Sequence, residues 1–166
     1  FLRNHISGFI PSTYYIGLQL NDKVVSILSI GKARYSKEAD YELLRFATRR
    51  GFTVVGGLSK MLAEFARRSK GRTLLTYADL RYGSGNAYTQ VGFTRMHDTE
   101  PGFSYFKGLH LVSRQQATHK KLPSLLGENY DPELSQDANM TAAGWRRIYD
   151  AGHRVFLLDL QEFIKR

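Results

Sequence analysis

The stretch of this chain best suited to chemistry runs from Thr73 to Phe93. An apolar run rich in Leu, Thr and Tyr ends on the carboxylate of Asp79, and a loop of Gly and Ser then leads to Tyr88. Such a run, bounded by turn residues, predicts a β-strand, and a carboxylate at the carboxyl end of a strand in an open α/β sheet points into the ligand crevice. We therefore expect Asp79 to take or relay a proton and Tyr88 to protonate a leaving group.

Each candidate has a structural alternative. Asp79 also suits the cap of the following turn, and Tyr88 suits a core position with its hydroxyl satisfied. Arg45 falls at an inward-facing position of a predicted strand that otherwise contains Leu and Phe. A buried Arg needs an anionic partner, which is either a ligand phosphate or Glu42. His5 is a lone histidine. If His5, Asp79 and Tyr88 converge, they could bind iron or zinc, because imidazole and carboxylate suit these metals.

The elements that must position these residues follow from the hydrophobic pattern. Apolar residues recurring at helical spacing from Leu58 predict an amphipathic helix over residues 58–70. A β-hairpin is predicted over 15–30, a strand over 41–47, the strand 73–79, a short helix over 85–91 and a strand over 103–106. After residue 107 the pattern favours a basic, helical segment, a short helix over 135–143, and a closing hairpin of residues 145–149 and 154–158.

Gly56, Gly57 and Ser59 open the predicted amphipathic helix. Two glycines let backbone amides approach an anionic ligand, and the helix dipole adds partial positive charge there. We expect these three residues to hold an anionic cofactor. Close packing explains the two glycines equally well, and helix capping explains Ser59.

Composition points to a polyanionic partner. The chain has 166 residues, a formal charge of +9 at pH 7 and 13% aromatic residues. A basic chain with interspersed aromatic residues predicts nucleic-acid binding, because each phosphate contact adds salt-dependent affinity; a solvated rim of charge is the alternative. The residues predicted to contact nucleic acid are Arg49, Arg50, Arg67, Arg68, Arg81, Lys120 and Lys121.

The amino-acid composition and the length of the apolar runs disfavour several classes of protein. No run reaches about 18 apolar residues, so no membrane partner is expected, and no secretory signal is visible. The chain has no Cys, which excludes thiolate metal sites. We expect a cytoplasmic location. The sequence opens at Phe1 rather than Met, which fits a part excised from a longer protein.

The order of a β-hairpin, a strand, a glycine loop with a helix, a strand, and then Gly85-Asn-Ala-Tyr-Thr-Gln-Val-Gly-Phe93 resembles the GNAT acyltransferase superfamily. This resemblance implies an α/β fold with a GNAT-like mixed sheet flanked by helices. The stretch Thr53-Val-Val-Gly-Gly-Leu58 departs from the superfamily's pyrophosphate-loop pattern, which argues against acetyl-CoA. The donor stays open, with an acyl-type group as one candidate.

A narrower resemblance covers about residues 1–106. Here the chain is similar to Mom-type phage DNA-modification proteins, which alter the adenine N6 amine. The matching residues are His5, Glu42 with Arg45, Ser59, Asp79 and Tyr88. This resemblance implies that His5, Arg45, Asp79 and Tyr88 form a catalytic site. It divides the chain into a GNAT-like core, residues 1–106, and a basic C-terminal extension, residues 107–166.

A second resemblance covers nearly the whole chain. Tyr41-Glu-Leu-Leu-Arg-Phe46, Tyr77-Ala-Asp79 and Gly144-Trp-Arg-Arg-Ile-Tyr-Asp-Ala-Gly152 are similar to GNAT-like domains that follow Vsr-like nuclease domains in phage homing-type endonucleases. The leading hypothesis is a phage-type transferase that modifies a DNA base amine. One alternative is a non-catalytic DNA-binding accessory domain, with a nuclease domain elsewhere in a longer chain. Another is an acetyl-CoA-dependent N-acetyltransferase.

Overall fold

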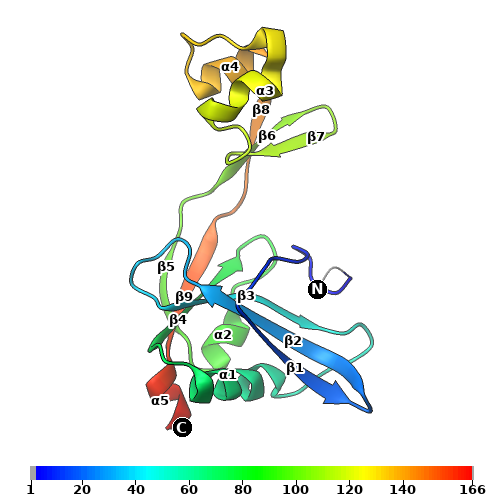
Figure 1. The fold of residues 1–166 in the computed structure, drawn as a ribbon, viewed down its shortest axis with the longest axis vertical. Helices are drawn as coiled ribbons and strands as arrows, with labels where there is room; N and C mark the ends of the chain where they lie inside the picture. The colour runs from blue at the N-terminus through cyan, green and yellow to red at the C-terminus, as the bar shows by residue number, and fades with distance from the viewer. Residues whose placement is uncertain (1–2, 166) are drawn as a thin grey trace. The chain divides into compact units, whose positions relative to one another are not determined.

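The computed structural model describes residues 3–165 and divides the chain into two compact units (Figure 1). Unit 1 comprises the residues up to Thr99 and those from His153 onward, and unit 2 comprises Glu100–Gly152. From the sequence we predicted a single boundary between two parts of the chain, between residues 106 and 107. The structure returns the last segment of the chain to the first unit, because its strand is part of the large sheet.

Unit 1 is built on a six-stranded mixed sheet with the order β1-β2-β3-β4-β9-β5. Neighbouring strands are antiparallel except β3 and β4, which are parallel. The predicted strands of the first half of the chain are confirmed. The strands are β1 (Tyr14–Leu20), β2 (Lys23–Lys32), β3 (Tyr41–Thr48), β4 (Thr73–Asp79), β5 (Thr94–Asp98) and β9 (His153–Asp159).

The parallel pair β3 and β4 separates soon after it forms. The ladder between these strands holds two residue pairs, made by Tyr41 and Glu42 of β3. A register shift in the neighbouring β2–β3 ladder leaves Leu44 as an extra residue in β3. An extra residue bends its strand and increases the local twist. The bulge at Leu44 therefore accounts for the opening between β3 and β4.

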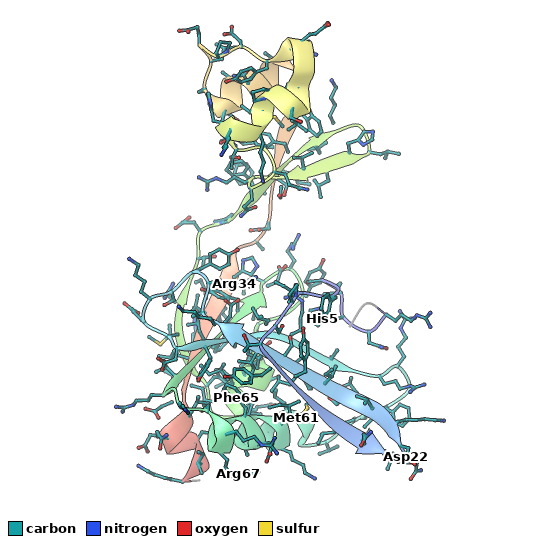
Figure 2. All side chains as sticks on the ribbon, in the orientation of Figure 1. His5, Asp22, Arg34, Met61, Phe65 and Arg67 are labelled. Carbon is teal, nitrogen blue, oxygen red and sulfur yellow. The ribbon has the colours of Figure 1, made fainter. Side chains whose placement is uncertain are left out.

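Helix α1 (Gly57–Arg68) covers one face of this sheet and contacts β1, β2 and the short helix α5 (Leu160–Ile164). The predicted amphipathic helix is confirmed. Met61 and Phe65 are buried against the sheet, and Figure 2 shows Arg67 pointing away from it. Full burial of an apolar side chain of this size contributes about 1.5–3 kcal/mol, so α1 holds the sheet that carries the cleft described below.

Unit 2 is a three-stranded antiparallel sheet with the order β7-β6-β8, together with short helices. Its own core surrounds Tyr105, which packs with Leu122 and Met140. The elements are β6 (Phe103–Lys107), β7 (His110–Ser113), η1 (His119–Lys121), α3 (Leu122–Leu126), η2 (Gly127–Asn129), α4 (Gln136–Ala142) and β8 (Arg146–Tyr149).

Several expectations for the second half of the chain are wrong. The strands expected to form a closing hairpin do not pair, because β8 joins β6 in unit 2 whereas β9 joins β4 and β5 in unit 1. The segment after residue 107 begins as strand β7 rather than as a helix. The predicted basic extension, residues 107–166, holds nine Lys and Arg against seven Asp and Glu, whereas unit 2, residues 100–152, holds six of each. The excess charge of +9 therefore belongs to unit 1.

Candidate functional site

A cavity of about 970 Å³ opens in unit 1 where β3 and β4 part. Its walls include residues 43–46 of β3 and 75–79 of β4, with loops on either side. His5, Arg45, Asp79 and Tyr88, the four residues expected to form a catalytic site, all line this cleft. The structure thus brings together four side chains that are separated by up to 83 positions in the sequence.

Tyr88 lies on the short helix α2 (Asn86–Gln90), which is fixed against β9. Its ring centroid is 5.5 Å from those of both Phe93 and Phe156. Gly85 caps α2 with a φ of 77°, and a Cβ there would collide with the Phe156 ring. Glycine is thus required for both backbone conformation and packing, and it seats Tyr88 beside the cleft.

The Tyr88 hydroxyl is suited to donating a proton. Burial raises its pKa above the usual value near 10, and this effect outweighs a hydrogen bond with Thr76 and the charge of Arg45, both of which lower the pKa. The phenol is consequently protonated at neutral pH. A protonated group in a cleft is what the protonation of a leaving group requires.

Asp79 is engaged by its own loop. Arg81 donates from Nε to Asp79 Oδ1 at 3.0 Å, and its backbone N–H donates to the same oxygen at 3.0 Å. The side-chain bond to Arg81 is the main cause of a lowered Asp79 pKa. A paired carboxylate with a lowered pKa is a weak base. The geometry therefore favours the turn-capping alternative for Asp79 over proton abstraction.

Arg45 holds the N-terminal segment against β3. Its guanidinium donates from Nε to Gly8 O at 3.2 Å, from Nη2 to Ser7 O at 3.4 Å and from Nη1 to Leu44 O at 2.7 Å. Within residues 3–165 it forms no ion pair, although it lines the cleft. Of the two anionic partners considered from sequence, Glu42 pairs with Arg34 instead, and a ligand phosphate stays a prediction.

Glu42 is buried and pairs with Arg34, a residue that sequence reasoning missed (Arg34 and His5 are labelled in Figure 2). Arg34 donates from Nη2 to Glu42 Oε1 at 2.6 Å and from Nε to Oε2 at 3.1 Å. This pair raises the pKa of Arg34. Arg34 precedes a tyrosine, as Arg81 does, and this repeated dipeptide is the sequence signal that could have identified it.

His5 is a neutral imidazole at neutral pH. Burial lowers its pKa, and the charges of Arg45 and the chain's amino terminus lower it further. The backbone N–H of Ser7 donates to His5 Nδ1 at 3.1 Å, which places the ring proton on Nε2. A neutral histidine in a cleft is a better proton acceptor than the ion-paired Asp79.

The metal site expected from His5, Asp79 and Tyr88 stays a prediction. Across residues 3–165, no three His, Cys, Asp or Glu side chains are grouped so as to hold a metal ion. Both Asp79 oxygens accept hydrogen bonds from Arg81. The predicted trio would have to displace Arg81 to bind a metal through this carboxylate.

Gly56, Gly57 and Ser59 lie outside the residues that line the cleft. Gly56 caps α1 with a φ of 66°, and a Cβ at Gly57 would lie 2.7 Å from Val54 Cγ1. Backbone conformation and close packing therefore account for both glycines. Of the residues expected to hold an anionic donor, Arg45 alone lines the cleft.

The predicted nucleic-acid-binding residues are divided between the two units, and three of those in unit 1 are engaged in ion pairs. Arg67 and Arg68 both pair with Glu64 on α1, and Arg81 pairs with Asp79. Lys120 and Lys121 belong to unit 2, whereas Arg49 and Arg50 follow β3 beside a second cavity of about 740 Å³.

Comparison with known proteins gives no further guide to function. No protein-family model matches the chain, and no curated protein matches its sequence. None of the helices formed by residues 3–165 has the length and apolar character to cross a membrane.

Proposed function

We propose that this chain is a GNAT-like transferase that attaches a small acyl-type group to the amino group of a DNA base. The observation that carries the proposal is the cleft between β3 and β4, because His5, Arg45 and Tyr88 line it together. The element order of unit 1 agrees with the order on which the GNAT resemblance is based. The +9 charge of unit 1 supports a polyanionic substrate.

The three cleft residues divide the chemistry between them. Neutral His5 accepts, at Nδ1, the proton that the base amine loses as it attacks the donor carbon, and the hydrogen bond from the Ser7 N–H to this nitrogen opens in that step. Arg45, which has no ion-pair partner among the described residues, holds the anionic part of the donor. Protonated Tyr88 protonates the leaving group. Asp79 acts as a positioning residue that fixes the loop of Arg81 at the rim.

The target base has to leave the duplex to reach these groups. A base inside a stacked helix is inaccessible to a cleft of this kind, so it is flipped out or is already single-stranded. Acetyl-CoA is the less favoured donor, because the glycine loop expected to bind its pyrophosphate does not line the cleft.

Mass spectrometry of nucleosides tests the proposal directly. DNA from cells that express the chain is digested and searched for a new nucleoside, with Tyr88→Phe and Tyr149→Phe as the variant and its matched control. Loss of the proton donor in Tyr88→Phe lowers modification by about 10²- to 10⁴-fold, whereas the exposed Tyr149 in unit 2 has no role. Equal modification by the wild type and Tyr88→Phe would falsify the mechanism.

One observation favours a second function. The carboxylates of the two strands that form the cleft, Glu42 and Asp79, are both neutralised by arginines, and a cleft in which both strand carboxylates are engaged also fits a non-catalytic DNA-binding domain attached to a nuclease. In that case DNA stays unmodified in a host able to supply the donor. The purified chain still binds DNA, and Arg45→Ala and Ser59→Ala leave that function intact.

A further inference from the structure

Two exposed tyrosines line the cleft and have no part in the chemistry above. Tyr35 is 74% exposed and Tyr82 is 61% exposed, yet both belong to the walls of the cavity. Tyr35 lies in the loop between β2 and β3, and Tyr82 lies in the loop between β4 and α2. Aromatic rings left exposed in a concave site offer planar ligands a face on which to stack.

The first ring is held in place by the buried ion pair. Cζ of Arg34 lies 5.2 Å from the ring centroid of Tyr35, and the same guanidinium is bound through two nitrogens to Glu42 at the start of β3. The arginine thus covers one face of the ring and ties it to the sheet. The remaining ring surface is in solvent beside the cleft.

The second ring repeats this arrangement on the other strand. Cζ of Arg81 lies 5.3 Å from the ring centroid of Tyr82, and Arg81 is bound to Asp79 at the end of β4. The backbone N–H of Tyr82 also donates to Asp79 O at 3.0 Å. A carboxylate, an arginine and an exposed tyrosine therefore occur together at the start of β3 and again at the end of β4.

We propose that Tyr35 and Tyr82 are stacking platforms for the bases of a single-stranded or flipped-out segment of nucleic acid. This inference rests on the proposed function for the identity of its substrate. Proteins that bind single strands combine aromatic platforms with a positively charged groove. Unit 1 as a whole carries the charge of +9, and Arg45 is a cleft arginine without an ion pair among the described residues. Both favour a polynucleotide over a single nucleotide, although the cleft lining itself balances Arg34, Lys37 and Arg45 against Glu38, Glu42 and Asp79.

A binding titration with the full chain tests the inference without any donor. The probe is a single-stranded DNA of about 12 nucleotides with one central 2-aminopurine, whose fluorescence reports stacking. The titration is run at about 50 mM salt. Tyr35→Ala and Tyr82→Ala each weaken binding by about 5- to 150-fold. Tyr35→Phe and Tyr82→Phe retain the ring and bind close to wild type.

Tyr149→Ala is the matched control, because Tyr149 is 57% exposed and contacts Arg147 but belongs to unit 2. It binds the oligonucleotide as the wild type does. Tyr35, Tyr82 and Tyr149 are all exposed, so circular dichroism should show that the variants fold as the wild type does. Wild-type affinity in both cleft alanine variants, an equal loss in Tyr149→Ala, or no binding by the wild type would overturn the inference.

Two further outcomes separate the inference from the proposed function. Stacking-dependent binding by a chain that produces no new nucleoside in cells supports the inference and contradicts the transferase. New nucleosides from alanine variants that bind normally support the transferase and overturn the inference. If coenzyme A displaces the oligonucleotide and itself binds more weakly to both alanine variants, the rings stack on the adenine of a donor, and the nucleic-acid assignment is wrong.

Discussion

Removing Arg34 should lower the free energy of unfolding of unit 1 by more than the removal of other surface side chains, because its ion-pair partner Glu42 is buried. The side chain of Glu42 is 3% exposed, and that of Arg34 is 38% exposed. Arg34→Ala removes two charged hydrogen bonds and leaves the carboxylate buried with the backbone N–H of residue 34. Breaking a buried pair costs about 3–5 kcal/mol, and partial exposure of Arg34 reduces the expected loss to about 2–3 kcal/mol.

Thermal and urea unfolding followed by circular dichroism measure this loss. For a chain of this size, about 2–3 kcal/mol corresponds to a decrease in Tm of about 4–12 °C. Arg68→Ala is the control, because Arg68 pairs with Glu64 at the surface, and such pairs contribute about 1 kcal/mol or less. The double variant Arg34→Ala/Glu42→Gln should be more stable than Arg34→Ala, since no charge stays buried without its partner. Equal stability of Arg34→Ala and the wild type would refute this reasoning.

The remaining predictions concern stability and binding. Asp40 accepts hydrogen bonds from the backbone N–H groups of Arg72 and Thr73, which lower its pKa. Its stabilisation is therefore present above about pH 4 and is lost as the pH falls through the lowered pKa. Urea midpoints of Asp40→Asn should lie below those of the wild type at pH 7 and converge with them at acid pH. Ser29→Ala should raise the free energy of unfolding by about 1 kcal/mol, because the Ser29 hydroxyl is buried without a partner among the described residues; a less stable variant would contradict this. DNA affinity should fall by about 10³-fold or more between 50 and 200 mM salt if six or more phosphates are contacted, and a salt-independent affinity measured by titration would exclude a phosphate-based interface.

The sequence was sufficient for the elements of unit 1 that depend on local pattern. The spacing of apolar residues in α1 and the apolar run that ends on Asp79 predicted a helix and a strand that the structure contains. The turn residues after Asp79 likewise predicted the loop and short helix that carry Tyr88. These features follow from nearest-neighbour chemistry, which acts within a few residues.

Pairing between distant segments was decided by the tertiary structure. The strands β8 and β9 are separated by only three residues and look like a hairpin, yet Asp150 accepts hydrogen bonds from Gly102 and Gly152 where the chain passes from one unit to the other. No local pattern encodes the partner of a strand, because the sheet face that completes its burial comes from elsewhere in the chain.

The same distinction holds within the cleft. The residue types of Arg45, Asp79 and Tyr88 indicated chemistry, but their partners determined which chemistry each can perform. Arg81 lies two residues from Asp79 and lowers the pKa of its carboxylate. Glu42 pairs with Arg34 rather than with Arg45. Ion pairing depends on distances of a few ångströms between side chains. The sequence therefore determined which residues could react, and the fold determined their charge, burial and neighbours.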